Sequence, residues 1–174
     1  MDKLGFSDFS FGEVLSFRGK WSIEHVRAGK VIGDIHFKNL VLNAGKTSIL
    51  DTMFNAASQV AANSWFAGLI NAAGFTGIVA ADTIASHAGW TELQTYAPST
   101  RPVWGQGAAA AQSITNAGPI VFTANASATV QGLFIVSQST KGGTTGLMWS
   151  AGLFTTPLPV VNLDELRCTY NLAT

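Results

Sequence analysis

The clearest alternation of hydrophobic and polar residues lies in residues 165–172, and it predicts a half-buried β-strand. Leu166, Cys168, Tyr170 and Leu172 fall on one face of this strand, and the polar residues between them fall on the other. Successive side chains of a strand point to opposite sides of a sheet, so the apolar set should face a core. Cys168 is then expected to act as a small buried hydrophobe.

A second region, near the start of the chain, predicts a β-hairpin. Residues 21–27 and 31–42 have the composition of strands, and the short turn of residues 28–30 (Ala-Gly-Lys) lies between them. Short turns that contain glycine commonly connect antiparallel strands. In the second strand, Ile35 and Phe37 alternate with charged and polar residues, as expected for a strand with one face in solvent.

One segment has the spacing of an amphipathic helix. Its apolar residues recur three and four positions apart, which places them on one helical face. They are Ile49, Leu50, Met53, Phe54 and Ala57. Asn43 precedes them and is a favourable N-cap residue. We expect one short α-helix near residues 44–58, with this face packed on a sheet.

Further segments have the length and composition of short strands. They are residues 64–71, 111–116, 120–125, 129–137 and 147–152. Turn-forming clusters separate the later ones, and Pro157 with Pro159 is read as one of these clusters. Regular short strands between turn signals are typical of sandwiches and barrels. The chain is therefore expected to be mainly β, a jelly-roll-like β-sandwich that forms a single domain over residues 20–174.

Residues 82–104 follow neither a helical nor a strand period. The stretch is predicted to be a long, ordered connection that bridges the two parts of the domain and helps to shape a partner surface. Its candidate residues are His87, Trp90, Glu92, Tyr96, Arg101 and Trp104. The aromatic rings could fill the core, anchor an interface or stack on a sugar. The polar residues would hold the loop, with an ion pair between Glu92 and Arg101.

Residues 1–19 are predicted to form an extended N-terminal arm. The arm contains several phenylalanines among glycines, serines and single charges, with neither a helical nor a strand period. They are Phe6, Phe9, Phe11 and Phe17. Exposed phenylalanines at this density would promote aggregation, so these side chains need a surface to bury against. That surface is either the chain's own domain or a neighbouring subunit.

Composition favours a subunit of an assembly. The chain has 174 residues, of which 47% are hydrophobic but only 11% are charged, against about 25% in typical soluble domains. Depletion of charge is typical of the cores of interfaces. The formal net charge is zero, and residues 93–163 contain only Arg101 and Lys141 as charged residues. Nucleic acid and acidic membranes are therefore not expected as partners.

Three further features of the sequence narrow the class of protein. No run of about 18 apolar residues is present, so no transmembrane helix is expected. The start of the chain lacks the apolar core of a secretory signal. A single cysteine gives no disulfide framework.

Two patterns contain residue types of known sites, but both are incomplete. Residues 43–48 place Gly-Lys-Thr before a helix, yet a phosphate-binding loop needs a glycine where Leu40 stands. Asp82, Ser86 and His87 are the residue types of a nucleophilic triad, but a serine next in sequence to its histidine has poor geometry. We expect no catalysis, no cofactor and no small-molecule substrate.

His25 and His36 could face each other across the predicted hairpin, which raises the question of a metal site. No third ligand of fixed spacing accompanies them. Structural and catalytic metal sites need three or four protein ligands. Two ordinary surface histidines are therefore expected, and no metal.

Several segments resemble the small virion structural proteins of tailed bacteriophages. The matching segments are WSIEHVRAGKVI, NLVLNAGKTSILDTMF, DTIASHAGWTELQTYAPSTRP, VQGLFIVSQSTKGGTTGLMWSAGLF and DELRCTYNL. They cover about residues 20–172. The block His-Ala-Gly-Trp-Thr-Glu with the later Arg-Pro is the most specific part. Two features depart from the pattern: residues 1–19 are extra, and Leu163-Asp164 stands where a Gly-Asp pair usually precedes the final strand.

The resemblance implies a non-enzymatic β-sandwich protein on the exterior of the capsid, assembled in the host cytoplasm. The role implied is that of a capsid decoration (cement) protein. It would form a homotrimer, bind the shell of major capsid protein and bridge neighbouring capsomers. Two alternatives stay open. One is a tail or baseplate protein with a glycan-binding loop, and the other is an enzyme such as a glycan hydrolase.

Overall fold

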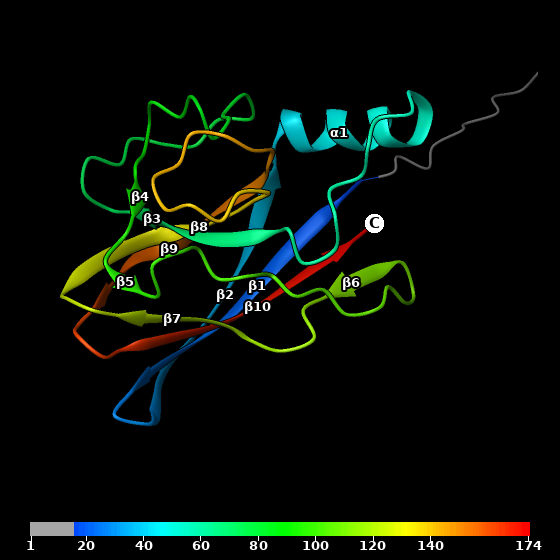
Figure 1. The fold of residues 1–174 in the computed structure, drawn as a ribbon. Helices are drawn as coiled ribbons and strands as arrows, with labels where there is room; N and C mark the ends of the chain where they lie inside the picture. Colours follow the sequence, from blue (N-terminus) through cyan, green and yellow to red (C-terminus); the bar gives the residue numbers. More distant parts are fainter. Residues whose placement is uncertain (1–15) are drawn as a thin grey trace, which may run out of the picture.

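The computed structural model describes residues 16–174 and has a mainly β architecture with one short helix, as predicted (Figure 1). Antiparallel strands curl around a common core in the manner of a β-sandwich. The elements are β1 (Arg18–Arg27), β2 (Lys30–Val41), α1 (Asn43–Phe54), β3 (Phe66–Asn71), β4 (Glu92–Leu93), β5 (Tyr96–Ala97), β6 (Ser113–Thr115), β7 (Ile120–Ala124), β8 (Ala128–Val136), β9 (Met148–Val160) and β10 (Glu165–Ala173).

The long strand β2 joins the two halves of the sandwich. Its first part pairs with β1, with Lys38 opposite Lys20. Its last residues pair with β9, with Asn39 opposite Gly152. The strand order is β4-β3-β8-β9-β2-β1-β10-β7-β5, and β6 pairs separately with β10. Some neighbouring strands are far apart in sequence: β9 lies beside β2, and β10 lies between β1 and β7.

Aromatic side chains fill the core between the two halves. Trp21 of β1 packs against Tyr170 of β10, with ring centroids 4.6 Å apart. Phe37 of β2 meets Phe154 of β9 edge-on at 5.1 Å. The predicted alternation of β10 is confirmed, because Leu166, Cys168 and Tyr170 are buried while the residues between them are more exposed. Burial raises the pKa of the Cys168 thiol, which suits a packing role.

The predicted hairpin of β1 and β2 is also confirmed. Ala28 and Gly29 form its turn with φ of 48° and 76°, the left-handed conformation that tight hairpin turns require. The strand β1 begins at Arg18, two residues before the boundary expected for the domain. Phe17 precedes it and already packs on the core. Phe6, Phe9 and Phe11 lie outside the described residues.

The strand β9 corrects one prediction. Pro157 and Pro159 were expected to form a turn, but both lie inside β9. Proline lacks the N–H that a strand neighbour on each side would need, so it is confined to edge positions. Here β2 pairs only with residues 150–152 of β9, and the prolines lie beyond that stretch, where β8 is the one partner strand.

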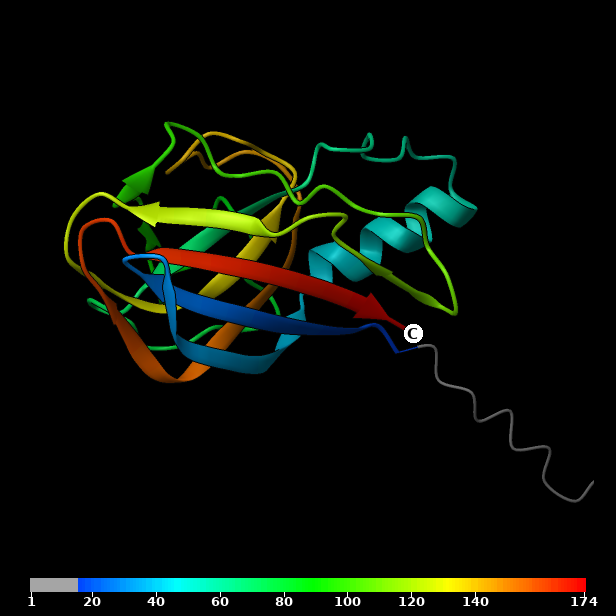
Figure 2. The same ribbon diagram turned by 90° about the horizontal axis from the view of Figure 1, so that it is seen from below.

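The helix α1 differs from its prediction at both ends. It begins at Asn43 with Leu42 as N-cap, and no side chain caps it. The backbone N–H of Asn43 donates to the carbonyl of Ala80 at 2.9 Å. The helix ends at Phe54, because Asn55 and Ala56 leave helical geometry, the latter with φ of 54°. The start of β1, the C-terminus and α1 lie at the same end of the molecule (Figure 2).

Candidate interaction surface

The stretch of residues 82–104 joins the two halves of the sandwich, as predicted. It contributes β4, which pairs with β3, and β5, which pairs with β7. These two strands are the opposite ends of the strand order, and only Gln94 and Thr95 separate them in sequence. Among residues 16–174, β4 and β5 are not paired with each other by backbone hydrogen bonds. The short covalent link between them therefore closes the curled sheet.

Glu92 and Arg101 form the ion pair proposed from the sequence. Arg101 donates from Nε to Glu92 Oε1 and from one terminal nitrogen to Oε2, each at 2.8 Å. Its other terminal nitrogen donates to the carbonyl of Gln138 at 2.8 Å. The side chains are 1% and 5% exposed. Paired, buried and fully hydrogen-bonded charges hold a loop in one geometry, so this pair links the stretch to the β8–β9 connection.

Lys141 reinforces the same junction from the β8–β9 connection. Its ammonium group donates to the carbonyls of Gln94 and Tyr96 and lies 3.9 Å from the centre of the Tyr96 ring. Burial lowers the pKa of Lys141 and raises the pKa of Tyr96. Tyr96 is almost fully buried. The ring is therefore part of the junction between β4 and β5.

The side chains of Trp90 and His87 also make their hydrogen bonds within the stretch of residues 82–104. The indole N–H of Trp90 donates to Asp82 Oδ2 at 3.0 Å, and His87 stacks on the Trp90 ring at 3.9 Å. The Nδ1 atom of His87 is bonded to the Trp90 carbonyl at 2.9 Å. The structure therefore brings Asp82 and His87 to Trp90, but Asp82 and His87 are not hydrogen-bonded to each other. Trp90 is buried, so its ring faces are not open to a ligand.

The two histidines of the hairpin are placed differently from expectation. His36 lies opposite Ser22, and His25 lies opposite Gly33, so they do not face each other. His36 is exposed and bonded to Asp34. His25 is buried, because its Nε2 atom is bonded to the buried Asp164 at 2.8 Å. No group of three metal-ligating side chains forms within residues 16–174.

Asp164 is the centre of a second buried polar cluster. Arg27 donates to both of its carboxylate oxygens at 2.7 Å, and the backbone N–H of Val161 donates at 2.9 Å. The hydrogen bonds from Arg27 hold the pKa of Asp164 well below its usual range, and the bonds from Val161 and His25 act in the same direction. Asp164 therefore fixes the turn before β10. Sequence reasoning missed this cluster, because 137 residues separate Arg27 from Asp164.

The helix α1 presents an apolar face to solvent, which corrects the prediction that this face packs on a sheet. Leu50, Met53 and Phe54 are 59%, 66% and 79% exposed, respectively. Only Ile49 of the predicted face packs against the core. The helix touches the sheet instead through Gly45, where an added Cβ would lie 2.7 Å from the Trp149 carbonyl oxygen. We call Leu50, Met53 and Phe54 the α1 face.

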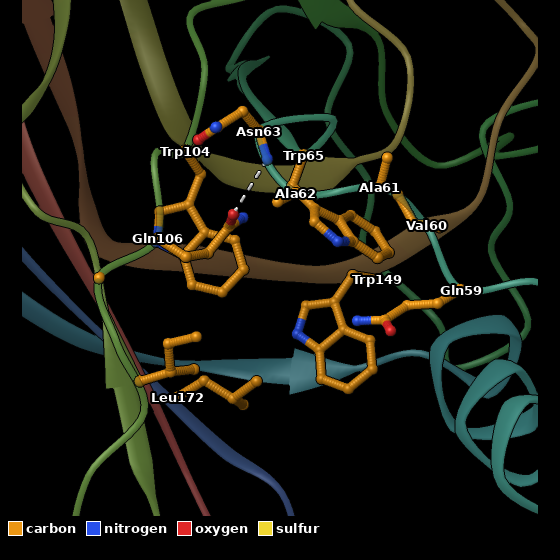
Figure 3. A pocket seen from close by; sticks show the side chains of 12 residues that line it. Gln59, Val60, Ala61, Ala62, Asn63, Trp65, Trp104, Gln106, Trp149 and Leu172 are labelled. Atoms are coloured by element: carbon orange, nitrogen blue, oxygen red, sulfur yellow. Dashed lines mark hydrogen bonds between the residues drawn. The ribbon is translucent and has the colours of Figure 1, made fainter.

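Beside the α1 face lies a hollow that we call the tryptophan groove. It consists of two adjoining pockets of about 400 Å³ and 320 Å³ that share Gln59, Val60, Trp65 and Trp149. Figure 3 shows the rings of Trp65, Trp104 and Trp149 around the larger pocket. The smaller pocket reaches Ile49 and Met53 of α1.

Of the residues proposed from the sequence, Trp104 lines this groove and Phe17 adjoins it, with its ring 5.8 Å from that of Trp149. Trp65 and Trp149 were not singled out, because each lies in or beside a predicted strand and reads as core. These two residues form the groove because the fold brings their rings together edge-on, with the ring centroids 6.3 Å apart. That contact joins residues 84 positions apart, which no local pattern reveals.

Comparison with protein-family models, with curated proteins and with solved structures finds no match for the chain. The resemblance to phage virion proteins therefore stays a prediction. Within residues 16–174, no helix has the length and apolar character needed to cross a membrane.

Proposed function

We propose that the chain is a non-enzymatic structural protein of a phage virion, a capsid decoration protein that binds the shell of major capsid protein. The observation that carries the proposal is the α1 face. Three large apolar side chains lie within one helical turn and a half and are more than half exposed. Contiguous exposed apolar patches on folded proteins mark interaction sites.

The low charge of the chain supports an assembly role. Only 11% of residues are charged, and α1 carries just Lys46 and Asp51. Burying such a helix against another protein requires little desolvation of charged groups. The two buried ion-pair clusters, around Arg101 and around Asp164, hold the loops of the sandwich instead. A rigid scaffold with an apolar docking helix suits a protein that binds a shell.

Association of three copies would allow the protein to bridge neighbouring capsomers. A homotrimer carries three α1 faces, so one particle can contact more than one capsomer. Fully burying side chains of this size contributes about 1.5–3 kcal/mol each. Three such faces acting together gain further through multivalency. Such a trimer would stabilise the head without any active site.

The test is binding to capsids that lack the protein. L50S/M53S/F54S should reduce capsid occupancy strongly, while the fold is retained. The matched control is V31S/I32S, which removes two exposed apolar residues from the hairpin, 55% and 51% exposed. Equal occupancy by wild type and the α1 variant would refute the proposal. The copy number per virion, from quantitative mass spectrometry, should approach that of the major capsid protein.

A tail or baseplate protein with a glycan-binding site is the second candidate. It is favoured by the amide side chains of Asn63 and Gln106, which line the same pocket as Trp104. Sugar sites commonly combine aromatic faces with a few polar groups. A few copies per virion, together with a glycan-array signal lost in Gln106→Ala, would support this candidate over the first.

A further inference from the structure

We propose that residues 1–15 of the chain dock in the tryptophan groove of their own domain, with Phe9 and Phe11 as the inserted side chains. This inference is independent of the capsid role. The groove and its immediate surroundings supply three observations that together select this occupant. They concern the chemistry of the walls, two unpaired donors and the point at which the described chain begins.

The walls of the groove select an uncharged, largely apolar occupant. None of the residues that line the two pockets is charged. The apolar walls come from Trp65, Trp149, Val60 and Ile49. A cavity of this size and polarity gains most from burying aromatic side chains. The phenylalanines of residues 1–15 have that character, and the charged residues around them can stay in solvent: Asp2, Lys3, Asp8 and Glu13.

Two buried donors at the groove select an occupant that offers acceptors. The indole nitrogen of Trp104 and the amide nitrogen of Gln106 have no hydrogen-bond partner among residues 16–174. A buried unpaired donor costs about 1–3 kcal/mol. Both nitrogens are fully covered in the described structure, so a shift of the two side chains has to accompany docking. An extended peptide, which presents a carbonyl oxygen at every residue, can then supply both acceptors. It also places Phe9 and Phe11 on one side, because side chains two residues apart share a face.

The start of the described chain lies at the groove. Phe17 packs edge-on against Trp149, and Gly19 is paired with Leu172, which also lines the groove. Phe11 lies six residues before Phe17, a reach of up to about 20 Å when extended. The segment can therefore enter the groove of its own domain. A short tether gives it an effective concentration on the order of millimolar, which favours this domain over a neighbouring copy.

Photo-crosslinking of the full chain tests the proposal. A benzophenone amino acid replaces Phe9, and light and isotope-labelled copies are mixed before irradiation. We expect crosslinks to residues 59–65, Met53 or Trp149 within the same copy. The same group at Val31, on the distant hairpin, is the control and should give no crosslinks to the groove. Crosslinks mainly between light and labelled copies, or none to the groove, would overturn the proposal.

A second measurement tests the same proposal without the benzophenone amino acid. In full-length F9S/F11S, the indole N–H of Trp104 should exchange with solvent several-fold faster than in wild type, as seen by NMR. The control F17S changes the neighbouring contact with Trp149 but keeps both inserted side chains, so Trp104 should stay protected. Unchanged exchange in F9S/F11S would refute docking. A saturable shift of the Trp104 signal in wild type on adding maltohexaose would instead assign the groove to a glycan.

Discussion

Arg101 holds Glu92 through two parallel hydrogen bonds of 2.8 Å each, and both side chains are buried within a loop that links the two ends of the sheet. Glu92 also accepts the backbone N–H of Gly142 at 2.6 Å. One ion pair thus fixes β4, the residues after β5 and the β8–β9 connection together. We therefore expect this pair to contribute to the closure of the sandwich.

The first prediction concerns the loss of one partner. Arg101→Met leaves the Glu92 carboxylate buried and unpaired, which should lower the free energy of unfolding by about 3–5 kcal/mol. Urea denaturation measures the change. Arg167→Met is the control, because Arg167 forms a similar pair with Glu165 at the surface; it should cost no more than about 1 kcal/mol. Similar costs for the two variants would contradict the proposed role of Arg101.

The second prediction concerns acid. Because Arg27 holds the pKa of Asp164 below its usual range in the folded state, the unfolded state binds the proton more readily. The stabilisation from this group is fully present above the unfolded pKa of about 4. It is lost as pH falls from there toward the lower folded value.

Urea midpoints measured across the acid range test this prediction. Wild type should lose stability below about pH 5, whereas Asp164→Asn should be less stable at neutral pH and less sensitive to acid. The exposed Asp34 provides the control, and Asp34→Asn should keep the acid-sensitive part of the wild-type curve. An Asp164→Asn curve parallel to that of wild type would rule out Asp164 as the source.

The third prediction concerns the turn before β10. Leu163 has φ of 70° and is 71% exposed. The left-handed conformation costs an L-residue roughly 1–2 kcal/mol, and glycine is free of that cost. Leu163→Gly should therefore increase the free energy of unfolding by about 0.5–1 kcal/mol. The thermal unfolding midpoint should rise accordingly. Leu163→Ala removes the side chain but keeps the strained φ, so it should give no such gain. A gain in both variants would point to the side chain instead.

The fourth prediction concerns the seat of α1. A Cβ at Gly45 would lie 2.7 Å from the Trp149 carbonyl oxygen and 2.8 Å from the Trp149 ring. Gly45→Ala should therefore displace the helix and cost about 1–3 kcal/mol, despite the better helix propensity of alanine. Gly118→Ala is the control, because nothing lies within 4 Å of its added Cβ. Thermal unfolding compares the two, and equal midpoints would show that α1 tolerates the change.

Local patterns predicted most of the strands. The alternation of β10, the hairpin turn at Gly29 and the mainly β class all follow from spacing that neighbouring residues impose. The Glu92–Arg101 pair could be predicted from the sequence because Arg101 follows Glu92 by only nine positions. Features that depend on distant partners were not predictable. The burial of His25 needs Asp164, and the extension of β9 through two prolines needs an unpaired side that only the sheet order reveals.

The helix shows why an apolar pattern does not settle burial. Leu50, Met53 and Phe54 have helical spacing, and such a stripe usually faces a core. In this fold the approach through Gly45 turns the stripe outward instead. The groove escaped prediction for a related reason, since Trp65 and Trp149 read as ordinary core residues until the fold brings them side by side.

The position of β10 has a consequence for synthesis of the protein. This strand lies between β1 and β7, yet it follows both of them in the sequence. A ribosome that has released β1 to β9 has produced strands whose shared neighbour is still in the exit tunnel. The sandwich can form only after β10 emerges, so a nascent chain interrupted before Glu165 should remain open to proteases.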